Sequence, residues 1–168
     1  LAYPFAAVYM HPEWDMDPEN GYPNDIGLVY IEEAMDLSSE FIVAATMAES
    51  GDFIDSECWI TGWGISNKEN PLLLPDILQE APMDVIPWET CNEEYPGFNP
   101  GHVCIASDDG LKSACSGDSG GPLNCKVGDD WQVAGIASWV WGLCNTDAPN
   151  AYTRVSYYRE WVREVTGI

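Results

Sequence analysis

Residues 115–123 of this 168-residue chain read Cys-Ser-Gly-Asp-Ser-Gly-Gly-Pro-Leu. The glycines on either side of Asp118 and Ser119 permit a tight turn that a Cβ atom would obstruct. Such a turn exposes the Ser119 hydroxyl and directs the backbone N–H groups of Gly117 and Ser119 at one point. Converging N–H groups stabilise an oxyanion, although a glycine-rich segment with a serine is also common in plain turns. These residues taken alone therefore predict either a nucleophile turn or an ordinary loop.

The same nine residues resemble the nucleophile segment of the chymotrypsin-family (trypsin-like) serine proteases. Asp25, which follows an asparagine and precedes an apolar run, is similar to the family's catalytic aspartate. Residues 58–64 resemble the strand that opens the second barrel of these proteases. The resemblance extends over residues 5–168. It implies an all-β fold, a chymotrypsin-like double β-barrel, of which this chain carries the end of the first barrel, the complete second barrel and a C-terminal α-helix.

The resemblance also implies a division into three parts. Residues 1–43 would form the C-terminal part of the first barrel and carry Asp25. Residues 44–57 would connect the barrels, and residues 58–168 would form the second barrel with Ser119 and the terminal helix.

Local sequence patterns predict the individual elements. Runs of good β-formers predict five strands, at residues 5–10, 26–31, 78–86, 102–105 and 131–140. Residues 88–95 are expected to form a short helix, and residues 65–76 an exposed loop that is rich in asparagine and proline. Apolar side chains at helical spacing predict the C-terminal helix, with Ser156 as a candidate N-cap and Trp161 in the core.

Acyl transfer to Ser119 is the chemistry that the resemblance implies. A histidine would take the serine proton, Asp25 would orient that histidine, and the N–H groups of Gly117 and Ser119 would hold the oxyanion. Asp118 would pair with an activating N-terminus. The segment 138–140 would align the substrate backbone as an added strand, through Ser138, Trp139 and Val140.

Specificity follows from three positions that correspond to the family's substrate pocket. Ser113 stands where trypsin-like members carry an aspartate, so this position offers no negative charge to pair with a lysine or arginine side chain. Val140 and Asn150 stand where members with deep pockets carry glycine, so their side chains should narrow the slot, as in the elastase-like subgroup. We therefore expect cleavage of proteins or peptides after small or medium apolar residues such as Ala, Val or Leu.

The family's histidine segment is missing, together with about the first third of its domain. His11 resembles a surface His-Pro turn, and His102 stands at a usually apolar place, so both are expected to be structural. Residues 1–4 do not resemble the activating N-terminus. We therefore expect this to be the larger chain of a two-chain protease, inactive alone, with histidine and N-terminus supplied by a smaller chain.

Cysteine usage indicates a disulfide-bonded, secreted protein. The six cysteines form no Cys-x-x-Cys pair, which argues against zinc, and sequence spacing alone leaves the pairing open. The resemblance implies three bridges, Cys58–Cys125, Cys91–Cys104 and Cys115–Cys144. All six thiols would then be used internally, so the smaller chain would associate non-covalently. No metal or other cofactor is expected.

Charge and hydropathy exclude some classes of partner. The net charge of −22, from 28 acidic against 6 basic residues, disfavours nucleic acid, because phosphate contacts need Lys and Arg. No apolar run is long enough to cross a membrane, and the first residues lack a signal-peptide pattern, so we expect a processed chain. The acidity indicates either solubility in salty or acidic fluid or attraction to cationic substrates or calcium. Two alternatives to the protease stay open, a non-catalytic binding protein on the same fold and an inactive fragment.

Overall fold

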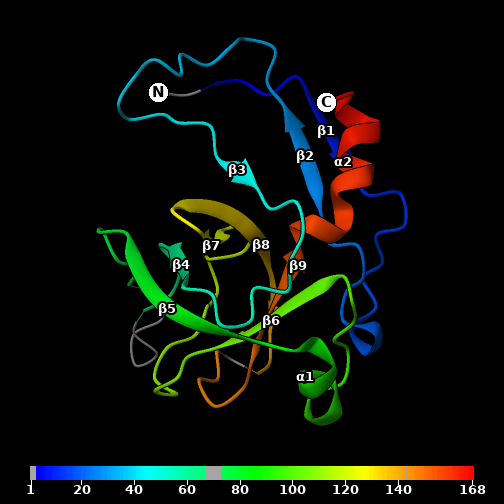
Figure 1. Cartoon of the computed structure of the whole chain (residues 1–168), viewed down its shortest axis with the longest axis vertical. Coiled ribbons are helices and arrows are strands. Elements are labelled where there is room, and N and C mark those ends of the chain that lie inside the picture. The colour runs from blue at the N-terminus through cyan, green and yellow to red at the C-terminus, as the bar shows by residue number, and fades with distance from the viewer. Residues whose placement is uncertain (1–2, 67–72, 143) are drawn as a thin grey trace.

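A computed structural model of the chain describes residues 3–66, 73–142 and 144–168. The described part is mainly β-structure, with one short helix inside the chain and one near its C-terminus (Figure 1). In chain order the elements are β1 (Ala7–Met10), β2 (Gly27–Tyr30), β3 (Thr46–Met47), β4 (Cys58–Gly62), β5 (Gln79–Ile86), α1 (Trp88–Glu94), β6 (His102–Ala106), β7 (Pro122–Val127), β8 (Asp130–Val140), β9 (Asn150–Arg154) and α2 (Arg159–Thr166).

Six strands form a closed antiparallel barrel in the order β8-β7-β4-β5-β6-β9, and pairing of β8 with β9 closes it. Strand β3 joins the barrel from outside, parallel to β8. Closure removes the open edges of the sheet, because every barrel strand has two neighbours. The predicted all-β fold with a complete second barrel and a C-terminal helix is confirmed.

Alternation of side chains along the barrel strands creates the core. On β4, Cys58 and Ile60 point inward, and on β7 Leu123 and Cys125 do the same; all four are buried. Cys58 lies directly opposite Cys125 in the strand register and is bonded to it. The structure also pairs Cys91 with Cys104 and Cys115 with Cys144, as the resemblance implied.

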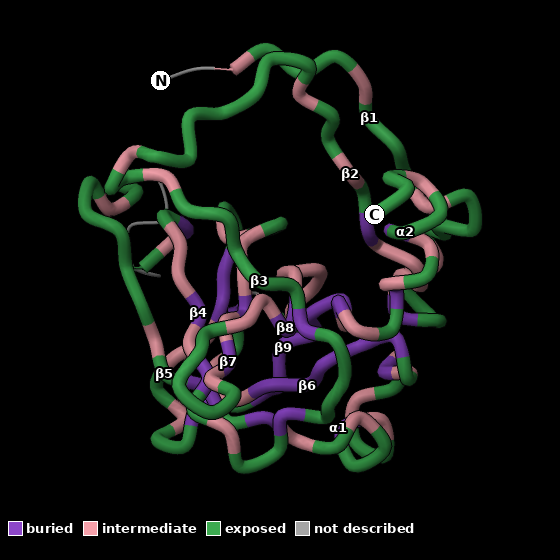
Figure 2. The backbone as a smooth tube through the Cα atoms, turned by 45° about the horizontal axis from the view of Figure 1, so that its top comes forward, coloured by how far each residue is buried: buried purple, intermediate pink, exposed green. Residues whose placement is uncertain are grey.

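The first-barrel part of the chain is a two-stranded antiparallel ribbon, β1–β2, that lies beside α2 and apart from the barrel sheet (Figure 1). Its apolar side chains are largely exposed, with Val8 at 54%, Met10 at 66% and Val29 at 60%. Figure 2 shows the contrast between this exposed ribbon and the buried barrel strands. Two strands alone are too few to cover an apolar face. The division at residues 43 and 57 stays a prediction.

The C-terminal helix begins later than its sequence signal indicated. Ser156 lies inside a single 3₁₀ turn, Val155–Tyr158, and α2 starts at Arg159 without a side-chain cap. The predicted N-cap is therefore wrong, because the tighter turn continues directly into the helix. Val162 is buried as expected, whereas Trp161 is only half-buried. The loop expected at 65–76 lies mostly outside the described residues, and neither described helix is long and apolar enough to cross a membrane.

Candidate active site

The turn that carries Ser119 is fixed to strand β8. Gly120 N–H donates to the Ala137 carbonyl at 2.9 Å, and Ala137 N–H donates back to the Gly121 carbonyl at 2.9 Å. Gly117 (φ +102°) and Gly120 (φ +78°) have the left-handed backbone that glycine adopts without strain. At Gly117 a Cβ atom would also come within 3.0 Å of Gly64 Cα. The glycines of the sequence motif thus serve both the conformation and the packing of the turn.

The two N–H groups expected to hold an oxyanion are available. Gly117 and Ser119 are exposed. Within residues 3–66, 73–142 and 144–168, neither backbone N–H donates a hydrogen bond to another residue of the chain. Free donors beside an exposed hydroxyl are the arrangement that stabilises negative charge developing on a carbonyl oxygen.

The Asp118 side chain is held between the Ser119 turn and the end of strand β4. Its carboxylate accepts hydrogen bonds from Gly64 N–H at 2.8 Å and Cys115 N–H at 2.9 Å. An added Cβ at Gly62 would lie 1.9 Å from Asp118 Oδ1, so this strand has room for the carboxylate only because it carries glycine. Burial, and secondarily the charge of Asp118, raise the pKa of Tyr152. Asp118 has no cationic partner among the ion pairs of the described residues.

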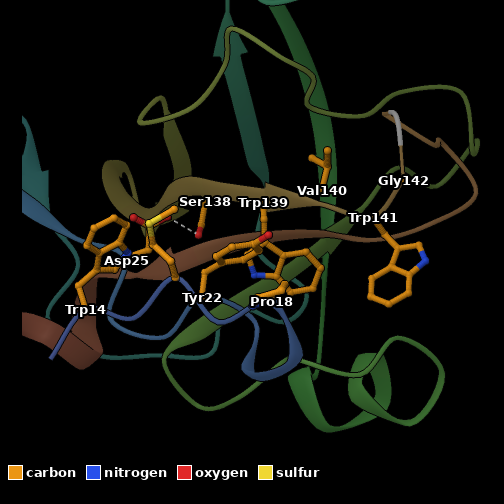
Figure 3. Close-up of a pocket in the computed structure, with 10 residues that line it drawn as sticks. Trp14, Pro18, Tyr22, Asp25, Ser138, Trp139, Val140, Trp141 and Gly142 are labelled. Atoms are coloured by element: carbon orange, nitrogen blue, oxygen red, sulfur yellow. Dashed lines mark hydrogen bonds between the residues drawn. The ribbon is translucent and has the colours of Figure 1, made fainter.

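Asp25 lies at the end of the loop between β1 and β2, just before β2, and faces strand β8. Its Oδ2 accepts a hydrogen bond from Ser138 Oγ at 2.6 Å (Figure 3), and its main-chain carbonyl accepts one from Thr153 Oγ1 at 2.7 Å. Asp25 and Ser138 line a cavity of about 580 Å³ with aromatic walls, including Trp14, Tyr22, Trp139 and Trp141. The aspartate is therefore held by barrel strands β8 and β9 at the edge of an open groove.

Ser138 lines two neighbouring cavities, one beside each of the two predicted catalytic residues. It lines the groove that contains Asp25 and also a smaller cavity of about 100 Å³ that contains Ser119. Trp139 and Val140 line both spaces as well. The structure thus brings Asp25 and Ser119 to one continuous surface, with residues 138–140, the segment expected to align the substrate, between them.

Neither histidine of the chain stands between Asp25 and Ser119. His11 packs on the 3₁₀ turn and on α2, with ring centroids 5.5 Å from Tyr158 and 5.1 Å from Trp161, and its Nδ1 accepts the Glu13 N–H. His102 is buried on β6 and lines neither cavity. The arrangement agrees with the sequence expectation that both are structural.

Two of the three predicted specificity positions, Ser113 and Asn150, form one hydrogen-bonded unit. Asn150 is 1% exposed; its Oδ1 accepts the Ala114 N–H at 2.7 Å, and its Nδ2 donates to Ser113 Oγ at 3.0 Å. Val140 lies beside the small cavity, which Ala114 and Ala151 also line. The amide of Asn150 is therefore satisfied by the protein itself, and it lies behind Ala114 and Ala151 rather than on the wall of the small cavity.

Comparison with known proteins assigns the family. The model of the trypsin family matches residues 2–162. This chain belongs to the trypsin family. The family's fold accounts for the closed barrel, the C-terminal helix and the turn around Ser119.

Known trypsin-family relatives are longer than this chain. The human chymotrypsin-like elastase family member 3B is 36% identical over 163 residues, which cover 94% of this chain and 59% of that protein. Bovine proproteinase E is 35% identical, with 94% and 63% covered. Mouse neuropsin, described as a serine protease expressed in the limbic system, superposes with a TM-score of 0.84 at 27% identity and covers 97% of this chain. The chain thus spans about six tenths of the length of these two sequence relatives.

Several contacts around the groove of this trypsin-family chain were not anticipated from the sequence. Thr153 supports the main chain at Asp25. Trp139, expected only to align the substrate backbone, also donates its indole N–H to the Gly21 carbonyl at 3.0 Å. Trp14 and Trp141 form opposite walls of the groove in Figure 3. The high tryptophan content was the available signal, but nothing local indicated which tryptophans face the groove.

Proposed function

We propose that this chain is the larger chain of a secreted two-chain serine endopeptidase that cleaves after small or medium apolar residues. The observation that carries the proposal is the continuous surface from Asp25 through Ser138 to an exposed Ser119 with unoccupied N–H donors. This surface would supply every part of the proposed acyl-transfer site except the histidine.

The proposed reaction proceeds through an acyl-enzyme. Ser119 Oγ attacks the peptide carbonyl while a partner histidine takes the hydroxyl proton and Asp25 orients that imidazole. The oxyanion forms opposite the Gly117 and Ser119 N–H groups. The same histidine then gives its proton to the departing amine, and water releases the acyl group by the reverse sequence.

Two features support a separate smaller chain. The ribbon β1–β2 exposes apolar side chains and has an unpaired edge on each strand, which suits the addition of further strands. Asp118 is held by neutral N–H donors in the described residues and is free to receive an amino terminus. Because all six cysteines are paired internally, the proposed association is non-covalent.

The substrate preference rests on the Ser113–Asn150 unit and on Val140. A long basic side chain would find no carboxylate at Ser113, and the Val140 side chain beside the small cavity would hinder a large aromatic one. The relatives named for elastase and proteinase E activity support this proposal. The three disulfides of this chain support an extracellular location.

A binding function without catalysis is the second candidate. It is favoured by the positions of His11 and His102, since neither lines the groove or the Ser119 cavity. The aromatic groove of about 580 Å³ would still accommodate a peptide in such a protein.

Labelling with a fluorophosphonate probe tests the proposal. Native material is treated with the probe, and the modified residue is located by mass spectrometry. Such probes react quickly only with a serine whose base and oxyanion donors are assembled. Labelling at Ser119, absent in Ser119→Ala and retained in the neighbouring exposed Ser116→Ala, supports the protease.

The intact mass of the native assembly, measured alongside, tests for the smaller chain. A mass above that of this chain, resolved into two components by denaturation without reduction, supports non-covalent association. Absence of labelling in an assembly of correct mass favours the binding protein instead. A partner released only by reduction would contradict the non-covalent model.

A further inference from the structure

The loop between β1 and β2 touches the turn between α1 and β6 through a contact between two backbones. Gly21 (φ +69°) faces Gly97 (φ +116°), and a Cβ atom added to Gly21 would lie 1.9 Å from the Gly97 carbonyl oxygen. No side chain fits between them. The groove-lining residues Pro18 and Tyr22 flank Gly21, so their position depends on how this contact is maintained.

The Gly21 carbonyl is also the acceptor for the Trp139 indole N–H, at 3.0 Å. The Trp139 ring packs on Phe98 with a centroid distance of 4.8 Å, and both rings meet His102 edge-on at 6.0 Å. Trp139 belongs to the strand expected to align the substrate backbone. The loop, the turn before β6 and the substrate strand therefore converge on His102.

His102 has a polar contact on each side of its ring. Its Nδ1 accepts the Asn99 N–H at 3.3 Å. A neutral imidazole with an acceptor at Nδ1 carries its proton on Nε2, and the Gly21 backbone lies in hydrogen-bonding reach of the imidazole. Burial, and then the charge of Arg154, lower the pKa of His102 to about 4, so the ring is neutral at neutral pH.

We propose that His102 is a positioning residue that fixes the Trp139 indole and the Gly21 loop relative to each other and so shapes the groove for substrate residues preceding the cut. His102 does not touch the reacting atoms. It acts through the Gly21 carbonyl, the Asn99 turn and the edges of two aromatic rings. The inference rests on the proposed function for its effect on substrates, while its structural part is independent of catalysis.

Exchange of the Trp139 indole hydrogen tests the structural part. In ¹⁵N NMR spectra of the native protein, with any accompanying chain, the signal is assigned through Trp139→Phe. His102→Leu removes both polar contacts and is expected to speed solvent exchange of this indole about fivefold, the effect of losing one neutral hydrogen bond. His102→Gln keeps a donor and an acceptor and should restore most of the protection. His11→Gln, in the other histidine, should change nothing.

Peptide kinetics test the consequence for substrates. For peptides with four residues before the cut, His102→Leu is expected to raise KM about fivefold, with kcat retained. Peptides with one residue before the cut should be cleaved as by the wild type. His102→Gln should recover the long substrates. If the leucine variant does not fold, His102→Asn, too short to reach Gly21, provides the same comparison.

The two measurements separate the inference from the proposed function. Unchanged indole exchange in the His102 variants overturns the positioning role, whatever the activity. Altered exchange in a protein that cleaves no peptide leaves the positioning role intact and contradicts the protease. Altered exchange with equal losses for short and long peptides overturns the role in shaping the groove.

Discussion

The Ser138 hydroxyl donates a hydrogen bond of 2.6 Å to Asp25 Oδ2, although the two residues are 113 positions apart in the chain. This bond joins the ribbon segment to strand β8 of the barrel. It fixes a carboxylate that lines the groove, and it leaves the other carboxylate oxygen of Asp25 without a hydrogen-bond donor among the described residues.

Replacement of Ser138 by alanine should therefore weaken both the fold and the site. A hydrogen bond to a charged group is lost, so we expect the free energy of unfolding to fall by about 2 kcal/mol, and kcat/KM of the assembled protease to fall with it. Urea unfolding and peptide hydrolysis measure the two effects. Ser156→Ala, at a half-buried serine in the 3₁₀ turn, should stay within about 0.5 kcal/mol of the wild type.

A methyl group at Gly64 should displace the carboxylate below the Ser119 turn. An added Cβ there would lie 2.5 Å from Asp118, so Gly64→Ala is expected to break the contact with Asp118 and abolish fluorophosphonate labelling. Gly27→Ala is the matched control, since its Cβ would meet nothing nearer than 3.4 Å. Full labelling of Gly64→Ala would contradict the assigned role of Asp118.

Removal of the Asn150 side chain should open the substrate pocket. For Asn150→Gly we expect the ratio of kcat/KM for Phe peptides over Ala peptides to rise about tenfold, an amount within the range of one pocket contact. Stability should drop by about 1–3 kcal/mol, because the buried Ala114 N–H loses its acceptor. Asn124→Ala, on the outer face of β7, should leave the ratio unchanged. If the ratio of kcat/KM for Phe over Ala peptides is unchanged in Asn150→Gly, the width of the substrate pocket is set by Val140 instead.

His102 should make stability depend on pH. Its pKa is about 4 in the folded chain, below the ordinary 6.5, so the unfolded chain binds more protons between these values. The part of the free energy of unfolding that depends on a neutral His102 is therefore fully present above pH 6.5. It is lost as the pH falls toward 4. The full effect is about 3 kcal/mol. Urea unfolding at pH 7 and at pH 4.5 measures this effect. The free energy of unfolding should differ less between the two pH values in His102→Leu than in the wild type.

Local patterns in the sequence were sufficient for most elements. Residues 78–86 read as a strand and form β5, Gln79–Ile86, while residues 88–95 read as a helix and form α1, Trp88–Glu94. Strands β3, β7 and β9 were not among the predicted ranges. The two residues of β3 are too few to show alternation, and they pair only with the neighbouring barrel strand β8. At Ser156 a good capping residue was present, but the 3₁₀ turn before α2 outweighed it.

Strand order and barrel closure came from the family resemblance, because pairing partners in a sheet are set by contacts far apart in the chain. The site shows the same limit. Asp25 and Ser119 could be named from their motifs, whereas the Ser138 bond, the Ser113–Asn150 unit and the Gly21–Gly97 contact depend on three-dimensional packing. These contacts decide the shape of the groove, and no local signal marks them.

The positions of the disulfides determine how the chain would respond to a protease. All six cysteines lie between residues 58 and 144, so only the main chain links the Asp25 ribbon covalently to the barrel. Residues 31–45 are largely exposed. One cut in that segment would leave Asp25 on a peptide retained by non-covalent contacts alone, while Ser119 stays in the cross-linked barrel. A single nick would thus make Asp25 dissociable from Ser119, and the activity of the proposed two-chain protease would decrease on dilution after such a cut.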